Sequence, residues 1–111
     1  MEVISTHINA DFDALASMAA AARLYPMARQ LFPGSQERNV REFLRETRFP
    51  FQPDRLKGFS FESMTRLILV DVKRITRIGP LRDVASRPGL DVHIYDHHPA
   101  HPKDISASLE V

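Results

Sequence analysis

The 111-residue sequence contains no cysteine. Disulfide bonds, zinc sites built from thiolates and thiol catalysis are therefore excluded, and the composition is compatible with a reducing cytoplasm. The N-terminus lacks the positively charged region and long apolar run of a secretion signal. The apolar runs are too short, or too often interrupted by arginine and proline, to cross a membrane. We therefore expect a cytoplasmic protein without a membrane partner.

The sequence also lacks a strong net charge, because 15 basic side chains are balanced by 14 acidic ones. A balance of +1 creates no strong field, so overall charge argues neither for nor against a nucleic-acid partner. The hydrophobic fraction of 43% and the charged fraction of 26% are ordinary for a globular protein. The length allows one domain with a modest core.

Strand and helix patterns alternate along the chain. Continuous apolar or β-branched runs predict strands at residues 2–6, 28–32, 66–72 and 90–98, and the final LEV looks like the opening of another. Helix formers predict helices at residues 14–24, 36–47 and 79–86, with Ser35 as the N-cap of the second. This alternation predicts an α/β fold, a mostly parallel sheet with helices on both faces.

Three predicted strands each finish in, or lead directly into, carboxylates or imidazoles. These residues are His7, Asp11, Asp13, Asp71, Asp96, His97 and His98. Ligands bind at the carboxyl ends of strands in open parallel sheets, so we expect these side chains at one edge. Gathered carboxylates would repel one another, and a divalent cation removes that cost. Oxygen-rich ligation with some imidazole suits manganese, and the number of donors suits two ions about 3.5–4 Å apart, as in phosphoester hydrolysis.

Each of these polar groups also has an ordinary structural explanation. Asp11 could cap the first helix, and Asp13 could complement its dipole. Asp71 could be a turn residue, and the DHHP segment could be a polar loop. Taken together, these explanations require three separate strands to end in metal-binding side chains by accident, which favours the metal site. Asn9 is interpreted as a turn residue.

The segments HINADFD, LVDV and YDHHP resemble, in order and spacing, the motifs of the DHH phosphoesterase family. That family includes RecJ-like exonucleases, oligoribonucleases, cyclic-dinucleotide phosphodiesterases and manganese-dependent inorganic pyrophosphatases. A second similarity, to the N-terminus of long bacterial proteins, covers EVISTHINADFDALASMAAAARLYP (residues 2–26) and FPGSQERNVREF (residues 32–43). In those proteins a DHH region precedes paired CBS domains and a tRNA nucleotidyltransferase or poly(A) polymerase-like region.

The resemblance implies a Rossmann-like DHH subdomain over residues 1–111 that binds two Mn²⁺ or Mg²⁺ ions. By this resemblance, His7 and Asp11 would hold one ion. Asp13 and His97 would hold the other, and Asp71 would bridge both. The ions would activate a water molecule for attack on a phosphodiester in RNA, a short oligonucleotide or a nucleotide.

The resemblance also implies catalytic roles for two further residues. Asp96 would orient its neighbours, as partners of ligating histidines do, and His98 would contact the phosphate or stabilise the leaving group. The family's fourth motif, which supplies a further metal-binding aspartate, and its C-terminal substrate-binding domain do not occur in these residues. We therefore expect a truncated subdomain with little activity alone, working with downstream domains of a longer chain.

Two other functions stay open at this point. The chain could be an RNA-handling or regulatory module of a tRNA nucleotidyltransferase or poly(A) polymerase-type protein. It could also be an interaction domain that retains these residues without using a metal.

Two further patterns have competing interpretations. The arginines at 38, 41, 45 and 48 recur at helical spacing and could follow a phosphate backbone, but interleaved glutamates favour a solvated, salt-bridged helix. The phenylalanines at 49, 51, 59 and 61 could stack on bases. We interpret them instead as core residues beneath an irregular loop.

Overall fold

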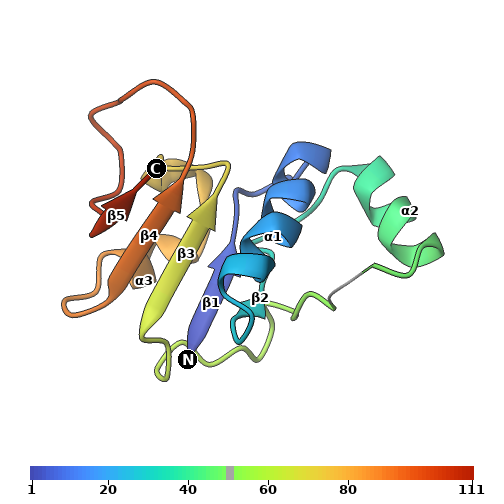
Figure 1. Ribbon diagram of the computed structural model, residues 1–111, viewed down its shortest axis with the longest axis horizontal. Coiled ribbons are helices and arrows are strands. Elements are labelled where there is room, and N and C mark those ends of the chain that lie inside the picture. Colours follow the sequence, from blue (N-terminus) through green and yellow to red (C-terminus); the bar gives the residue numbers. More distant parts are fainter. Residues whose placement is uncertain (50–51) are drawn as a thin grey trace.

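The fold is described from a computed structural model that covers residues 1–49 and 52–111 (Figure 1). Within those residues, a five-stranded parallel sheet has the order β2-β1-β3-β4-β5. The strands are β1 (Glu2–Ser5), β2 (Arg29–Gln30), β3 (Arg66–Val70), β4 (Asp91–Tyr95) and β5 (Leu109–Glu110). The helices are α1 (Phe12–Leu24), α2 (Arg38–Glu46) and α3 (Leu81–Ala85), with a 3₁₀ turn, η1 (Ile75–Arg77). The predicted α/β fold is confirmed.

The sheet carries a core on each face, because helices cover both faces. On one face, Ile4 and Ile68 pack against α1, which contributes Leu15 and Met18. On the other face the side chains of β1, β3 and β4 pack against η1 and α3, whose Leu81 is fully buried. Figure 1 shows α1 and α3 on opposite sides of the sheet. Burial on both faces explains why β3 reads as a continuous apolar run.

The predicted elements occur, with shifted boundaries. The predicted strand at 90–98 ends at Tyr95, so the DHH residues lie beyond β4. The final LEV does form a strand, β5. The turn η1 was not predicted, since three residues leave no periodic signal. Among the described residues, no helix combines the length and apolar character needed to cross a membrane.

The prediction that Ser35 caps the second helix is wrong. Helix α2 begins at Arg38 with Glu37 at the N-cap, and no side chain caps it. The Ser35 carbonyl instead accepts a hydrogen bond from the Ala10 N–H at 3.1 Å, in a short parallel bridge between Ala10 and Gln36. The segment before α2 is therefore extended alongside the loop that follows β1, which delays the start of the helix.

The other two sequence patterns have structural roles. The Arg38 Nε donates to Glu42 Oε1 at 3.1 Å on the exposed face of α2, as expected for a salt-bridged helix. Phe49, Phe59 and Phe61 are partly buried against the two cores. Phe51 lies outside the described residues. The core interpretation is confirmed for the three described phenylalanines.

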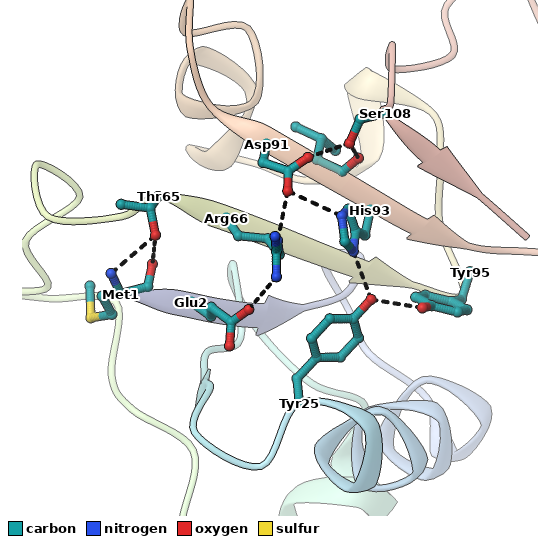
Figure 2. A network of polar contacts seen from close by, with 10 residues as sticks. Met1, Glu2, Tyr25, Thr65, Arg66, Asp91, His93, Tyr95 and Ser108 are labelled. Atoms are coloured by element: carbon teal, nitrogen blue, oxygen red, sulfur yellow. Dashed lines mark hydrogen bonds and ion pairs between the residues drawn. The ribbon is translucent and has the colours of Figure 1, made fainter.

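An ionic network joins the strands at the end of the sheet opposite the DHH residues (Figure 2). The Arg66 guanidinium donates to Glu2 Oε2 and to Asp91 Oδ2, each at 2.7 Å. The Ser108 hydroxyl also donates to Asp91 and, together with Arg66, holds the pKa of the Asp91 carboxyl below its usual value. The network thus connects β1, β3 and β4 through one arginine.

A second part of the network docks the end of α1 onto β4. The Tyr25 hydroxyl lies 2.7 Å from His93 Nδ1 and 2.7 Å from the Tyr95 hydroxyl (Figure 2). Burial, and then these bonds to Tyr95, raise the pKa of Tyr25, so the phenol stays protonated and can donate. The helix that carries Asp11 at its start is therefore anchored to the sheet at its other end.

Two glycines hold the loop between β1 and α1 (residues 6–11). The Ile8 side chain lies so close to Gly34 and Gly79 that a Cβ at either position would be 3.1 Å from Ile8 Cγ2. Gly79 also has a φ of +55°, and a Cβ there would lie 3.1 Å from the Pro33 carbonyl oxygen. Gly79 is thus required both for its left-handed backbone and for the close approach of the loops.

We predict that Gly79→Ala lowers the free energy of unfolding by about 1–3 kcal/mol, because it adds backbone strain to a clash with a carbonyl. Urea unfolding measures the loss. The matched control is Gly89→Ala, at a φ of +84° with no atom within 4 Å of the new Cβ, which should show only the backbone cost. Equal losses of unfolding free energy in the two variants would show that the contacts around Ile8 do not contribute to stability.

Candidate metal centre

The candidate site lies where the strand order changes direction. The chain goes from β1 to β2 on one side and then returns to β3 on the other, so the crevice at the carboxyl ends of β1 and β3 is a topological switch point. Ser5 pairs with Leu69, and two more steps of this register place His7 level with Asp71. Val70 pairs with Tyr95, and one further step places Asp71 level with Asp96. The parallel register therefore aligns the polar residues from three strands.

The first group of candidate ligands contains His7, Asp11 and Asp71. Each offers one ligand atom, and these atoms lie within 4.8 Å of one another. His7 Nε2 is 3.8 Å from Asp11 Oδ1 and 3.6 Å from Asp71 Oδ2. These separations are too long for good hydrogen bonds. They suit donors arranged around a shared cation.

The imidazole of His7 is oriented so that Nε2 can act as a ligand. Its Nδ1 lies 2.7 Å from the Ile8 carbonyl oxygen, which only accepts, so Nδ1 carries the proton. The lone pair of the neutral ring is then on Nε2, facing the two carboxylates. The ring is 5% exposed, and the neighbouring Thr6 hydroxyl donates to the Val70 carbonyl at 2.8 Å. The end of β1 is therefore held rigidly against β3.

The second group contains Asp71, His97 and His98, whose ligand atoms also lie within 4.8 Å of one another. The two histidine rings stack with their centroids 4.8 Å apart. His98 Nδ1 lies 2.5 Å from Asp96 Oδ1, which leaves His98 Nε2 available. The Asp96 carboxyl is fully buried, and within the described residues its Oδ2 has no hydrogen-bond partner. A buried, unpaired carboxylate oxygen beside two imidazoles suits a site that takes a cation.

Asp71 belongs to both groups, and its carboxyl has a shifted pKa. Burial raises the pKa of its carboxyl, and the nearby Asp11 charge raises it further. Its backbone has a φ of 57°, a left-handed conformation that turns the chain sharply at the end of β3. Asn9, the expected turn residue, has a similar φ of 54°. Ionisation of the carboxyl shared by both groups is thus disfavoured by its surroundings.

Asp11 caps α1, and its carboxylate also faces the rest of the first group of candidate ligands. Its Oδ1 accepts a hydrogen bond from the Ala14 N–H at 2.9 Å and so caps α1, and the same oxygen faces His7. Asp13 is exposed in the first turn of α1 and belongs to neither group found among the described residues. Five of the seven expected residues thus belong to these groups, Asp96 lies beside His98, and Asp13 is a member of neither group.

Three cations beside the site were not expected from the sequence. Lys73, Arg74 and Arg77 line a pocket of about 120 Å³ together with Asp71, Asp96, His98 and Asp104. The signal was present, since the segment KRITR follows LVDV directly. The KRITR segment did not show where its side chains would lie, because the η1 turn was not predicted. This turn brings Arg77 back to the site.

The match to known proteins agrees with this arrangement. The family described as "DHH family, N-terminal domain" matches residues 2–110, so the chain belongs to the DHH family. It is 50% identical over 109 residues to the A-adding tRNA nucleotidyltransferase of Geobacter sulfurreducens. That match covers 97% of this chain but 12% of the relative.

A solved structure shares the fold. The crystal structure of an exopolyphosphatase-related protein from Bacteroides fragilis matches with a TM-score of 0.73 and 20% identity. The match covers 99% of this chain and 34% of that protein. The resemblance to DHH proteins seen in the sequence is therefore confirmed at the level of family and fold.

We predict that Asp71→Asn stabilises the metal-free chain at neutral pH. The raised pKa means that folding favours the protonated carboxyl, so this contribution to stability is present at low pH and is lost as pH rises through the folded pKa. An amide keeps the uncharged form at every pH. Thermal unfolding with a chelator should show a higher Tm for the variant at pH 7 and little difference at pH 3.

The control for this prediction is Glu62→Gln, which removes an exposed carboxylate that precedes β3, whereas Asp71 follows the other end of that strand. It should leave the Tm nearly unchanged at both pH values. An Asp71→Asn variant that is less stable than the wild type at pH 7 would contradict the argument that this carboxylate is under electrostatic strain.

Proposed function

We propose that the chain is the N-terminal subdomain of a metal-dependent phosphoesterase that hydrolyses phosphodiester bonds in RNA, short oligonucleotides or nucleotides. The observation that carries this proposal is the position of Asp71, whose carboxylate is shared by two groups of potential ligands. One carboxylate between two donor sets is the arrangement expected for a pair of cations.

The first ion would be held by His7, Asp11 and Asp71. The second would be held by Asp71 and His97. Asp13 remains a proposed ligand of the second ion because of family membership, not because of its position. When bound, two such cations lower the pKa of water and offset the charge that develops on phosphate oxygens. We propose Mn²⁺, or Mg²⁺ in its place, because the donors are oxygen and imidazole without thiolate.

The proton chemistry of the proposed reaction is assigned to His98. Asp96 Oδ1 accepts a hydrogen bond from Nδ1 of this ring, with 2.5 Å between the two atoms. Nε2 is therefore the nitrogen that can give a proton to the leaving oxygen. Asp96 is thus proposed to position His98, while His98 contacts the substrate.

A second candidate function is favoured by the relative from Geobacter sulfurreducens, which is named as an A-adding tRNA nucleotidyltransferase. The chain could serve such a protein as an RNA-handling or regulatory module, with hydrolysis secondary or lost. This alternative accounts for the 50% identity to that relative. It gives no separate account of the two ligand groups around Asp71.

We predict that calorimetry detects Mn²⁺ binding to the 111-residue chain and that Asp71→Asn weakens it more than about 100-fold. Changing a residue in the outer shell of a site already costs about 10–100-fold, and Asp71 would be a shared ligand. Asp83→Asn, an exposed substitution on α3, is the matched control and should bind Mn²⁺ normally. A chain that binds no Mn²⁺ would leave only the metal-independent interaction domain.

Because the chain matches only 12% of its relative from Geobacter sulfurreducens, we propose that it works within a longer protein, and hydrolysis is tested there. We predict that this longer protein cleaves dinucleotides or short RNA with Mn²⁺ present, and that the isolated chain cleaves little. His98→Ala should lower kcat at least about 100-fold, the usual contribution of general acid catalysis. Absence of cleavage, together with RNA binding that Asp71→Asn leaves intact, would favour the RNA-handling module instead.

A further inference from the structure

We propose that Arg77 binds phosphate oxygens of the substrate beside the candidate metal centre. This inference rests on the proposed function and adds a positively charged substrate contact that comes from the η1 turn. The same side chain is proposed to orient the phosphate and to stabilise negative charge on it during the reaction.

The backbone fixes Arg77 at the edge of the site. The Ile8 N–H donates to the Arg77 carbonyl at 2.8 Å, which ties η1 to the loop after β1. The Arg77 N–H donates to the Arg74 carbonyl at 3.0 Å, which closes the 3₁₀ turn. Ile8 in turn packs against Gly79. Arg77 is therefore attached to the same loop that presents His7.

The guanidinium of Arg77 faces the site without being used within it. Its Nη2 lies 3.4 Å from His7 Nδ1, but that nitrogen already donates its proton to the Ile8 carbonyl at 2.7 Å. Two donors cannot form a hydrogen bond with each other, so the approach is a contact only. The donors of the guanidinium are left available for an acceptor that enters the pocket.

The charge of Arg77 is likewise not neutralised by the carboxylates around it. Asp71 and Asp96 line the same pocket, yet within residues 1–49 and 52–111 no ion pair joins Arg77 to any carboxylate. By contrast, Lys73 pairs with Glu110 at 3.8 Å. An arginine that served to balance the ligand carboxylates would pair with one of them. This arginine is positioned for an anion from outside the chain.

A phosphate group is the anion that suits this position. The planar fork of arginine matches two oxygens of a tetrahedral phosphate and forms charge-assisted hydrogen bonds. His98, the proposed acid, lines the same pocket, so a phosphate there could reach both side chains. Arg74 and Asp104 also line the pocket, and Asp104 Oδ2 accepts a hydrogen bond from the His101 N–H at 2.8 Å.

The test is a calorimetric titration of inorganic phosphate into the 111-residue chain saturated with Mn²⁺. Arg77→Gln should weaken phosphate binding about 10-fold or more, the loss typical of a hydrogen bond to a charged group. Its Mn²⁺ affinity should not fall, because removing a positive charge beside a cation site relieves repulsion. Arg77→Lys, which keeps the charge without the fork, should bind phosphate with intermediate affinity.

The matched control is Arg82→Gln, which removes an exposed arginine from α3 and should change neither affinity. Circular dichroism verifies that each variant is folded. Unchanged phosphate affinity in Arg77→Gln would overturn the inference, and so would a wild-type chain that binds Mn²⁺ but no phosphate. A parallel loss of Mn²⁺ affinity in Arg77→Gln would show that Arg77 supports the centre and not the substrate. Absence of Mn²⁺ binding by the wild-type chain would instead overturn the proposed function itself.

Discussion

The candidate site depends on one electrostatic constraint, the placing of the Asp71 carboxylate directly beyond a buried parallel strand. Burial and the neighbouring Asp11 both raise the pKa of this carboxyl, so its ionised form is under strain. The parallel register leaves little freedom to move it, because Asp71 is level with His7 on one side and Asp96 on the other. The proposed cations would offset this charge, and the surrounding carboxylates and imidazoles would be their ligands.

Contacts between the loops around the sheet hold Asp71 and its neighbours in place. Ile8 packs against Gly34 and Gly79, and its N–H binds the Arg77 carbonyl, so the turn after β3 is locked to the loop after β1. At the opposite end, the bonds of Arg66 to Glu2 and Asp91 hold the same strands together. A site built from separate loops needs this support, since ligand atoms must stay within a fraction of an ångström of productive positions.

Family membership and the site's geometry address different questions. The DHH match over residues 2–110 accounts for the fold and for the residue types at the strand ends. The relative from Geobacter sulfurreducens is named as an A-adding tRNA nucleotidyltransferase, and this chain spans 12% of it. The structure further shows that Arg77 and His98 line the same pocket. Arg77 lies on η1, a turn that the sequence pattern did not predict.

Local patterns in the sequence determined most of the fold. The apolar run 66–70 and the alanine-rich run after Asp11 were enough to predict a buried strand and a helix, because strand and helix periodicities are local properties. The start of α2 was missed because an extended pairing between Ala10 and Gln36 overrode the local preference of Ser35. Likewise, sequence pattern pointed to the polar strand ends as one site. Only the tertiary structure decided which of these residues form the two ligand groups and that Arg77 lies beside them. Distances between separate loops depend on packing and on backbone hydrogen bonds, which no local sequence pattern encodes.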